Sequence, residues 1–137
     1  EGLASEPGPY ALQAAIAACH ARAETAGATD WVRIAELYER LARVTGSPVV
    51  ELNRAVALGM AYGPEAGLAL LDQLDGLPAL SGYHLLPSVR GDLLDKLGRH
   101  EEARAEFARA ATMTQNEQER RLLRERASGR SAGQAAP

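Results

Sequence analysis

The sequence has few of the residues that build disulfide frameworks, aromatic cores or β-strands. Its 137 residues include one cysteine, and aromatic residues make up 4%. Because Cys19 stands alone, a disulfide within the chain is excluded and nothing indicates an oxidising compartment. Valine and isoleucine do not alternate with polar residues, so a strand signal is almost absent. We therefore expect an all-α fold with a core of leucine and alanine, since alanine has the highest helix propensity.

The charge balance and the lack of long apolar runs exclude two further classes. The net charge of −3 argues against direct binding of a nucleic-acid backbone, which requires clustered lysine and arginine. No apolar run approaches the ~20 residues that span a membrane, and the first residues do not form a signal peptide. We expect a cytoplasmic protein without membrane contact. Because the chain starts at Glu1 rather than methionine, we also expect it to be a piece of a longer protein.

Glycine and proline divide the chain into about seven expected helices. The expected ranges are 9–26, 31–45, 48–62, 64–75, 83–97, 101–114 and 117–127. Short connections favour antiparallel helical hairpins, which either stack into a tetratricopeptide-like solenoid or close into a compact bundle. We assign residues 1–127 to one helical domain and residues 128–137 to a flexible tail.

Polar residues mark several helix starts. Thr29 or Asp30 and Ser47 can each accept a backbone N–H bond at a helix N-terminus, and Asn116 with Glu119 resembles a capping box. In the helix over 48–62, the expected inward face is Val49, Asn53, Val56 and Met60. Asn53 would then be a buried amide that either bonds a loop carbonyl or anchors a bound peptide.

Residues 87–114 carry the spacing of a tetratricopeptide hairpin. The matching positions are Gly91, Leu94, Gly98, Ala103, Phe107 and Ala110. In this interpretation Gly91 allows the paired helices to approach closely, Gly98 makes the turn, and Phe107 fills the space between repeats. The preceding hairpin is a decayed copy, with Gly63 at the position of Gly98.

Four longer strings resemble one protein family. They are residues 8–18 (GPYALQAAIAA), Asp30-Trp31, residues 47–57 (SPVVELNRAVA) and residues 82–87 (GYHLLP). Together they resemble the bacterial extracytoplasmic-function sigma factors that carry a C-terminal tetratricopeptide-like extension, over about residues 6–127. The resemblance implies a regulatory role in transcription initiation, through contact with the parent protein's own sigma domains, RNA polymerase or a regulator. The promoter-binding sigma domains themselves are not in this sequence, so sigma activity is not carried over.

Six residues are candidates for a partner-binding groove. They are Tyr38, Asn53, Arg54, Tyr83, His84 and Arg90. Arg90 shares a helical stripe with leucines, so we expect it either to pair with a carboxylate or to lie at a groove edge. The same set supports an alternative function, the sensing of a small acidic or amphipathic ligand.

The sequence offers little for catalysis or metal binding. Cys19 and His20 are adjacent, so on a helix their side chains point about 100° apart and make a poor metal pair. No GxSxG string or phosphate-binding glycine loop is present. We therefore predict a protein that is not an enzyme and that needs no metal or cofactor.

Overall fold

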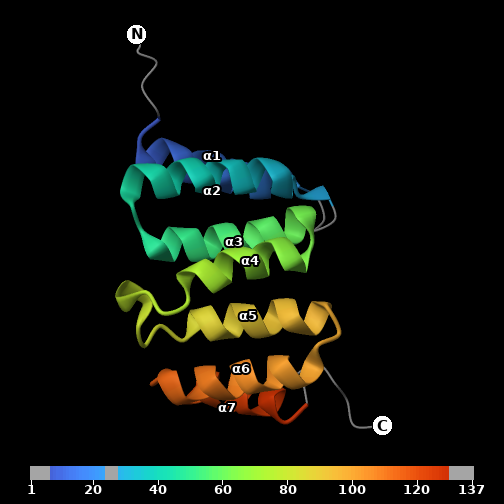
Figure 1. Ribbon diagram of the computed structural model, residues 1–137. Coiled ribbons are helices and arrows are strands. Elements are labelled where there is room, and N and C mark those ends of the chain that lie inside the picture. Colours follow the sequence, from blue (N-terminus) through green and yellow to red (C-terminus); the bar gives the residue numbers. More distant parts are fainter. Residues whose placement is uncertain (1–6, 24–27, 130–137) are drawn as a thin grey trace. The chain divides into compact units, whose positions relative to one another are not determined.

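The computed structural model describes residues 7–23 and 28–129, and within them the chain is all-α, as predicted (Figure 1). Its seven described α-helices are α1 (Pro9–Arg22), α2 (Trp31–Thr45), α3 (Pro48–Tyr62), α4 (Pro64–Leu74), α5 (Leu85–Lys96), α6 (His100–Met113) and α7 (Glu117–Ala127). A short 3-10 helix, η2 (Pro78–Leu80), lies between α4 and α5. Six of these ranges lie within two residues of the expected ones. The exception is α1, which was expected to reach residue 26 and ends at Arg22; residues 24–26 of the expected range lie outside the described residues.

The chain contacts group into two compact units, residues 1–70 and 71–137, and α4 crosses the boundary between them. Our assignment of residues 1–127 to a single domain stays a prediction. The expected tail, residues 128–137, lies outside the described residues from 130 onward.

Side-chain caps begin three of the helices. The Asp30 carboxylate accepts from the Arg33 amide at 3.1 Å, and the Ser47 hydroxyl accepts from the Val50 amide at 3.3 Å. At α7 the Asn116 side chain accepts from the Glu119 amide at 3.0 Å. Each bond satisfies an N–H group that the helix itself leaves free.

The capping box at α7 is only half formed. The Glu119 carboxylate accepts a bond from the Thr114 hydroxyl at 2.8 Å instead of reaching the Asn116 amide. The Asn116 amide donates to the Thr114 hydroxyl oxygen at 3.2 Å. Thr114, which is buried just before the helix, therefore bridges Asn116 and Glu119, which the capping-box pattern would bond directly to each other.

In the N-terminal unit α1 packs against α2, and α2 against α3. The buried cluster consists of Leu12, Ile16 and Cys19 of α1, Ile34, Ala35, Leu37 and Leu41 of α2, and Ala57 of α3. Leu12, Ile16 and Cys19 are the buried residues of α1, and their spacing of four and three residues places them on one helix face. Trp31 is half-buried against this cluster.

The predicted inward face of α3 is wrong. Asn53 is exposed, and Val49 and Met60 are 40% and 42% exposed. The buried residues of this helix are Leu52, Ala55, Ala57 and Gly59. Helix α3 carries apolar residues on several of its sides, so periodicity alone does not select the face that is buried. The helix buries the side that holds its small residues, because small side chains let neighbouring backbones approach.

In the C-terminal unit α5 packs against α6, and α6 against α7, in alternating directions (Figure 1). The inward face predicted for the helix over 101–114 is confirmed, because Ala103, Phe107, Ala110 and Ala111 are all buried. Helix α5 begins at Leu85, two residues after the start expected at residue 83. Pro87 lies within its first turn, where a missing N–H leaves no helical bond unmade.

Candidate functional site

The α5–α6 hairpin is built around one very close approach. A Cβ atom added at Gly91 would lie 2.6 Å from Cε1 of Phe107, which is closer than real Cβ contacts allow. Only glycine therefore fits beside the Phe107 ring, which is 1% exposed. Leu94, Ala103 and Ala110 are buried around this contact. Gly98 makes the turn between the helices with φ +80°, a region that favours glycine.

Helix α7 covers the other side of this contact with an arginine. The Arg126 guanidinium lies 4.0 Å from the centre of the Phe107 ring, which is the geometry of a cation–π interaction. Arg126 also pairs with Asp92 at 2.6 Å and with Asp95 at 3.7 Å, both on α5. Phe107 thus connects all three helices of the unit. Sequence reasoning assigned no role to Arg126, since nothing in the local pattern of α7 points to Phe107.

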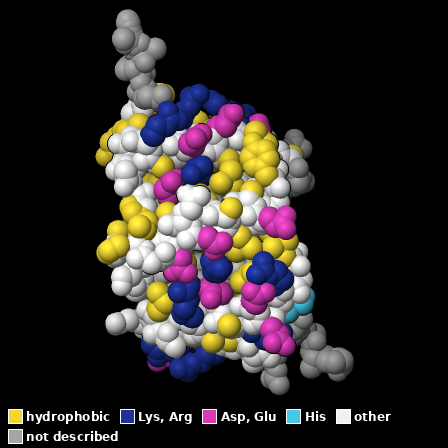
Figure 2. All heavy atoms as spheres, viewed as in Figure 1, with side chains coloured by type: hydrophobic (Ala, Val, Ile, Leu, Met, Phe, Trp, Pro, Cys, Tyr) yellow, Lys and Arg dark blue, Asp and Glu magenta, His cyan; other side chains and the backbone are white. Residues whose placement is uncertain are grey.

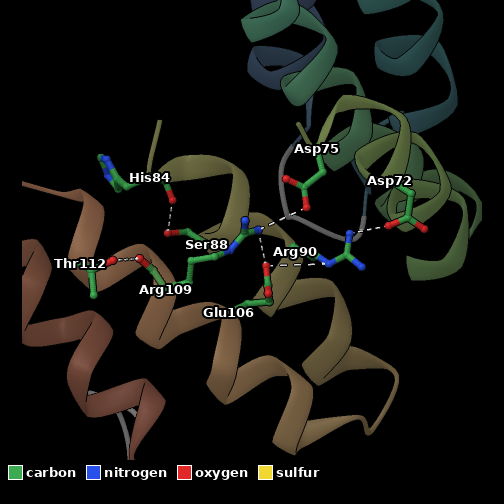
Figure 3. A network of polar contacts seen from close by, with 8 residues as sticks. All are labelled: Asp72, Asp75, His84, Ser88, Arg90, Glu106, Arg109 and Thr112. Carbon is green, nitrogen blue, oxygen red and sulfur yellow. Dashed lines mark hydrogen bonds and ion pairs between the residues drawn. The ribbon is translucent and has the colours of Figure 1, made fainter. Parts of the chain in front are cut away.

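A chain of five alternating charges joins the end of α4 to α5 and α6 (Figure 3). Arg90 of α5 pairs with Asp72, and its Nε lies 3.8 Å from Glu106 of α6. Arg109 continues the chain, with Nη2 at 2.7 Å from Glu106 and 3.5 Å from Asp75. Of the two interpretations of Arg90, the structure supports the one in which it pairs with a carboxylate.

Burial and ion pairing have opposite effects on the pKa of Arg109. Burial by itself would lower the pKa of Arg109, but the bonds to Glu106 and Asp75 raise the pKa above its ordinary value. The guanidinium therefore stays charged, and its charge is already balanced by two carboxylates. In Figure 2, acidic and basic side chains lie interspersed over the lower part of the view, which holds this unit. On the face drawn in Figure 2, such mixing does not favour a large field of one sign that would attract a charged partner.

A pocket of about 150 Å³ lies beside Arg109, between the loop over 75–83 and helices α5 and α6. Its apolar lining includes Leu80, Leu86, Pro87 and Met113. Its polar lining includes Asp75, Arg109 and Tyr83. The Nε–H of Arg109 is buried and finds no hydrogen-bond acceptor among the described residues. A buried donor of this kind is unusual in folded proteins, but the atom is covered by the protein and is not open to the pocket. The mixed apolar and polar lining makes the pocket the candidate binding site of this unit.

Two glycines shape the loop that forms one side of this pocket. Gly76 and Gly82 have φ values of +94° and +79°, which other residues rarely adopt. Between them η2 directs Leu80 inward, where it is 5% exposed, while Leu77 remains 39% exposed. The loop was expected from the Gly-Leu-Pro sequence, but the pocket beneath it was not.

The six candidate groove residues divide equally between the two units. Tyr38, Asn53 and Arg54 belong to residues 1–70, whereas Tyr83, His84 and Arg90 belong to residues 71–137. Tyr83 lines the pocket, but Arg90 is held in the charge chain. The structure therefore brings no single groove together from all six within either unit.

His84 lies at the start of α5, where its ring faces α7. Its Nε2 atom is 3.4 Å from the Glu119 carboxylate, and its ring centre is 6.4 Å from that of Tyr83. The His84 carbonyl accepts from the Ser88 hydroxyl at 2.9 Å (Figure 3). These contacts hold the first turn of α5, which forms part of the pocket wall.

In the N-terminal unit, one candidate residue forms an ion pair within its helix, one packs against the apolar cluster, and one is exposed. Arg54 pairs with Glu51 on the same helix at 2.7 Å. Burial raises the pKa of the Tyr38 hydroxyl, and its ring packs against the apolar cluster. Asn53 is exposed, so it is not the buried amide that the periodicity predicted.

The described part of the chain contains neither a metal-ligand cluster nor a helix suited to crossing a membrane. Residues 7–23 and 28–129 contain no group of three or more His, Cys, Asp or Glu side chains arranged to hold a metal ion. Across the same residues, none of the helices has both the length and the apolar character that crossing a membrane requires.

Comparison with known proteins finds one long match. The chain is 51% identical over 118 residues to an uncharacterized protein of Rhizobium meliloti. That match covers 86% of this chain and 27% of the relative, so the chain spans about a quarter of the relative's length. No family model and no solved structure matches the chain.

Proposed function

We propose that this chain is a regulatory, protein-binding extension of a bacterial extracytoplasmic-function sigma factor. In this role it acts in transcription initiation by contacting its own sigma domains, RNA polymerase or a regulator in the cytoplasm. It has no catalytic activity and no cofactor of its own. The observation that carries the proposal is the set of four family strings, which lie in the family's order along the chain.

The C-terminal unit supports this proposal physically. A hairpin with a close helix approach at Gly91 is the packing expected from the tetratricopeptide spacing, and repeats of this type bind protein segments on helical surfaces. The much longer relative is also compatible with a chain that functions next to other domains.

The proposal is tested by removing these residues from the parent protein. We expect transcription from a cognate promoter, measured in vitro with purified polymerase, to change when residues 1–137 are deleted. We also expect the isolated chain to bind the parent's sigma domains or the polymerase in titration calorimetry. Unaltered transcription together with no binding to either would contradict the proposal.

The alternative function is the sensing of a small ligand in the C-terminal unit. The pocket beside Tyr83 and Arg109 favours it, because its lining combines apolar walls with the polar side chains of Asp75, Tyr83 and Arg109. Its volume of about 150 Å³ is below the range of about 300–1,000 Å³ that is usual for small-molecule sites. For this reason we place protein binding first.

A further inference from the structure

We draw no further inference here: the strongest candidate, the uncharged outward face of α1 that Tyr10, Ala14, Ala17 and Ala21 form opposite its buried residues, is a stripe of mostly small side chains, and nothing in the structure shows what covers it.

Discussion

The interactions inside the N-terminal unit differ in kind from those inside the C-terminal unit. In the N-terminal unit the described core is leucine, isoleucine, alanine and one cysteine, and its described ion pairs join residues three positions apart on one helix. In the C-terminal unit ion pairs cross between elements, as in Arg126–Asp92 and Arg90–Glu106. Apolar burial has no direction, whereas ion pairs and ring contacts do. The C-terminal unit therefore fixes its helices by orientation as well as by volume, and it also holds the candidate pocket.

The largest expected effect follows from removing the central side chain of each unit. Phe107→Ala should cost about 3–5 kcal/mol and Leu41→Ala about 2–5 kcal/mol of unfolding free energy, because each leaves a cavity in a buried site. Hydrogen exchange should show lost protection in α5–α7 for Phe107→Ala and in α1–α3 for Leu41→Ala. Equal loss over the whole chain from either variant would show that the units do not respond separately.

The next effect concerns the close contact in the C-terminal hairpin. Gly91→Ala places a methyl group 2.6 Å from the Phe107 ring, so we expect a destabilisation of about 1–3 kcal/mol by overpacking, despite the better helix propensity of alanine. Urea unfolding measures this loss.

A smaller side chain at position 107 should relieve that clash. In the Gly91→Ala background, Phe107→Leu should cost clearly less than it does alone, which a double-mutant cycle detects. Gly8→Ala, where an added Cβ meets nothing within 4 Å, is the matched control and should change stability little. Additive effects of Gly91→Ala and Phe107→Leu would show that the ring already has room to move.

A smaller effect separates ion pairs between helices from those within one helix. Arg126→Gln removes both the contact with the Phe107 ring and the Asp92 pair, so we expect a loss of about 1 kcal/mol. Arg54→Gln removes only a pair within α3 and should cost about 0.2–0.5 kcal/mol. Thermal unfolding in low and high salt measures both. A larger cost for Arg54→Gln would reverse the proposed difference between the units.

The smallest effect is a pH dependence at the start of α6. The hydrogen bond from Arg99 lowers the pKa of the exposed Glu102 carboxyl below its ordinary value. The folded-state pKa is thus below the unfolded one, so this stabilisation is fully present above the unfolded pKa of about 4.3 and is lost as the pH falls through the folded pKa. Glu102→Gln should therefore lower Tm slightly at pH 7 and leave it unchanged at pH 2, with Glu101→Gln as the control. An equal Tm change at both pH values would assign the effect to something other than this charge.

The sequence predicts most of what depends on neighbouring residues. Pro48 after Ser47, or Gly98 after Leu97, determines locally whether a helix starts or stops, and these boundaries are where the structure has them. The spacing predicted a close approach of two helices at Gly91, but it assigned Phe107 to the space between repeats, and only the structure shows the ring lying against Gly91. Asn53 could not be placed, because α3 carries apolar residues on several sides and only its packing against α2 selects the buried one.

Sequence reasoning predicted only part of the candidate site. Tyr83 and Arg90 were singled out, yet Arg109, Arg126 and the pocket were missed. These residues interact with elements that are distant in sequence, such as the loop that holds Asp75 and the α5 carboxylate of Asp92. No local pattern carries that information.

The sequence by itself thus determined the helical class, most helix ends and the close approach at Gly91, since propensity, capping and short-range spacing act within about one hairpin. Only the tertiary structure decided which face of α3 is buried, which carboxylates pair with Arg109, and that its buried Nε–H has no acceptor among the described residues. The reason is that burial and ion pairing depend on distances in space between groups that the chain separates.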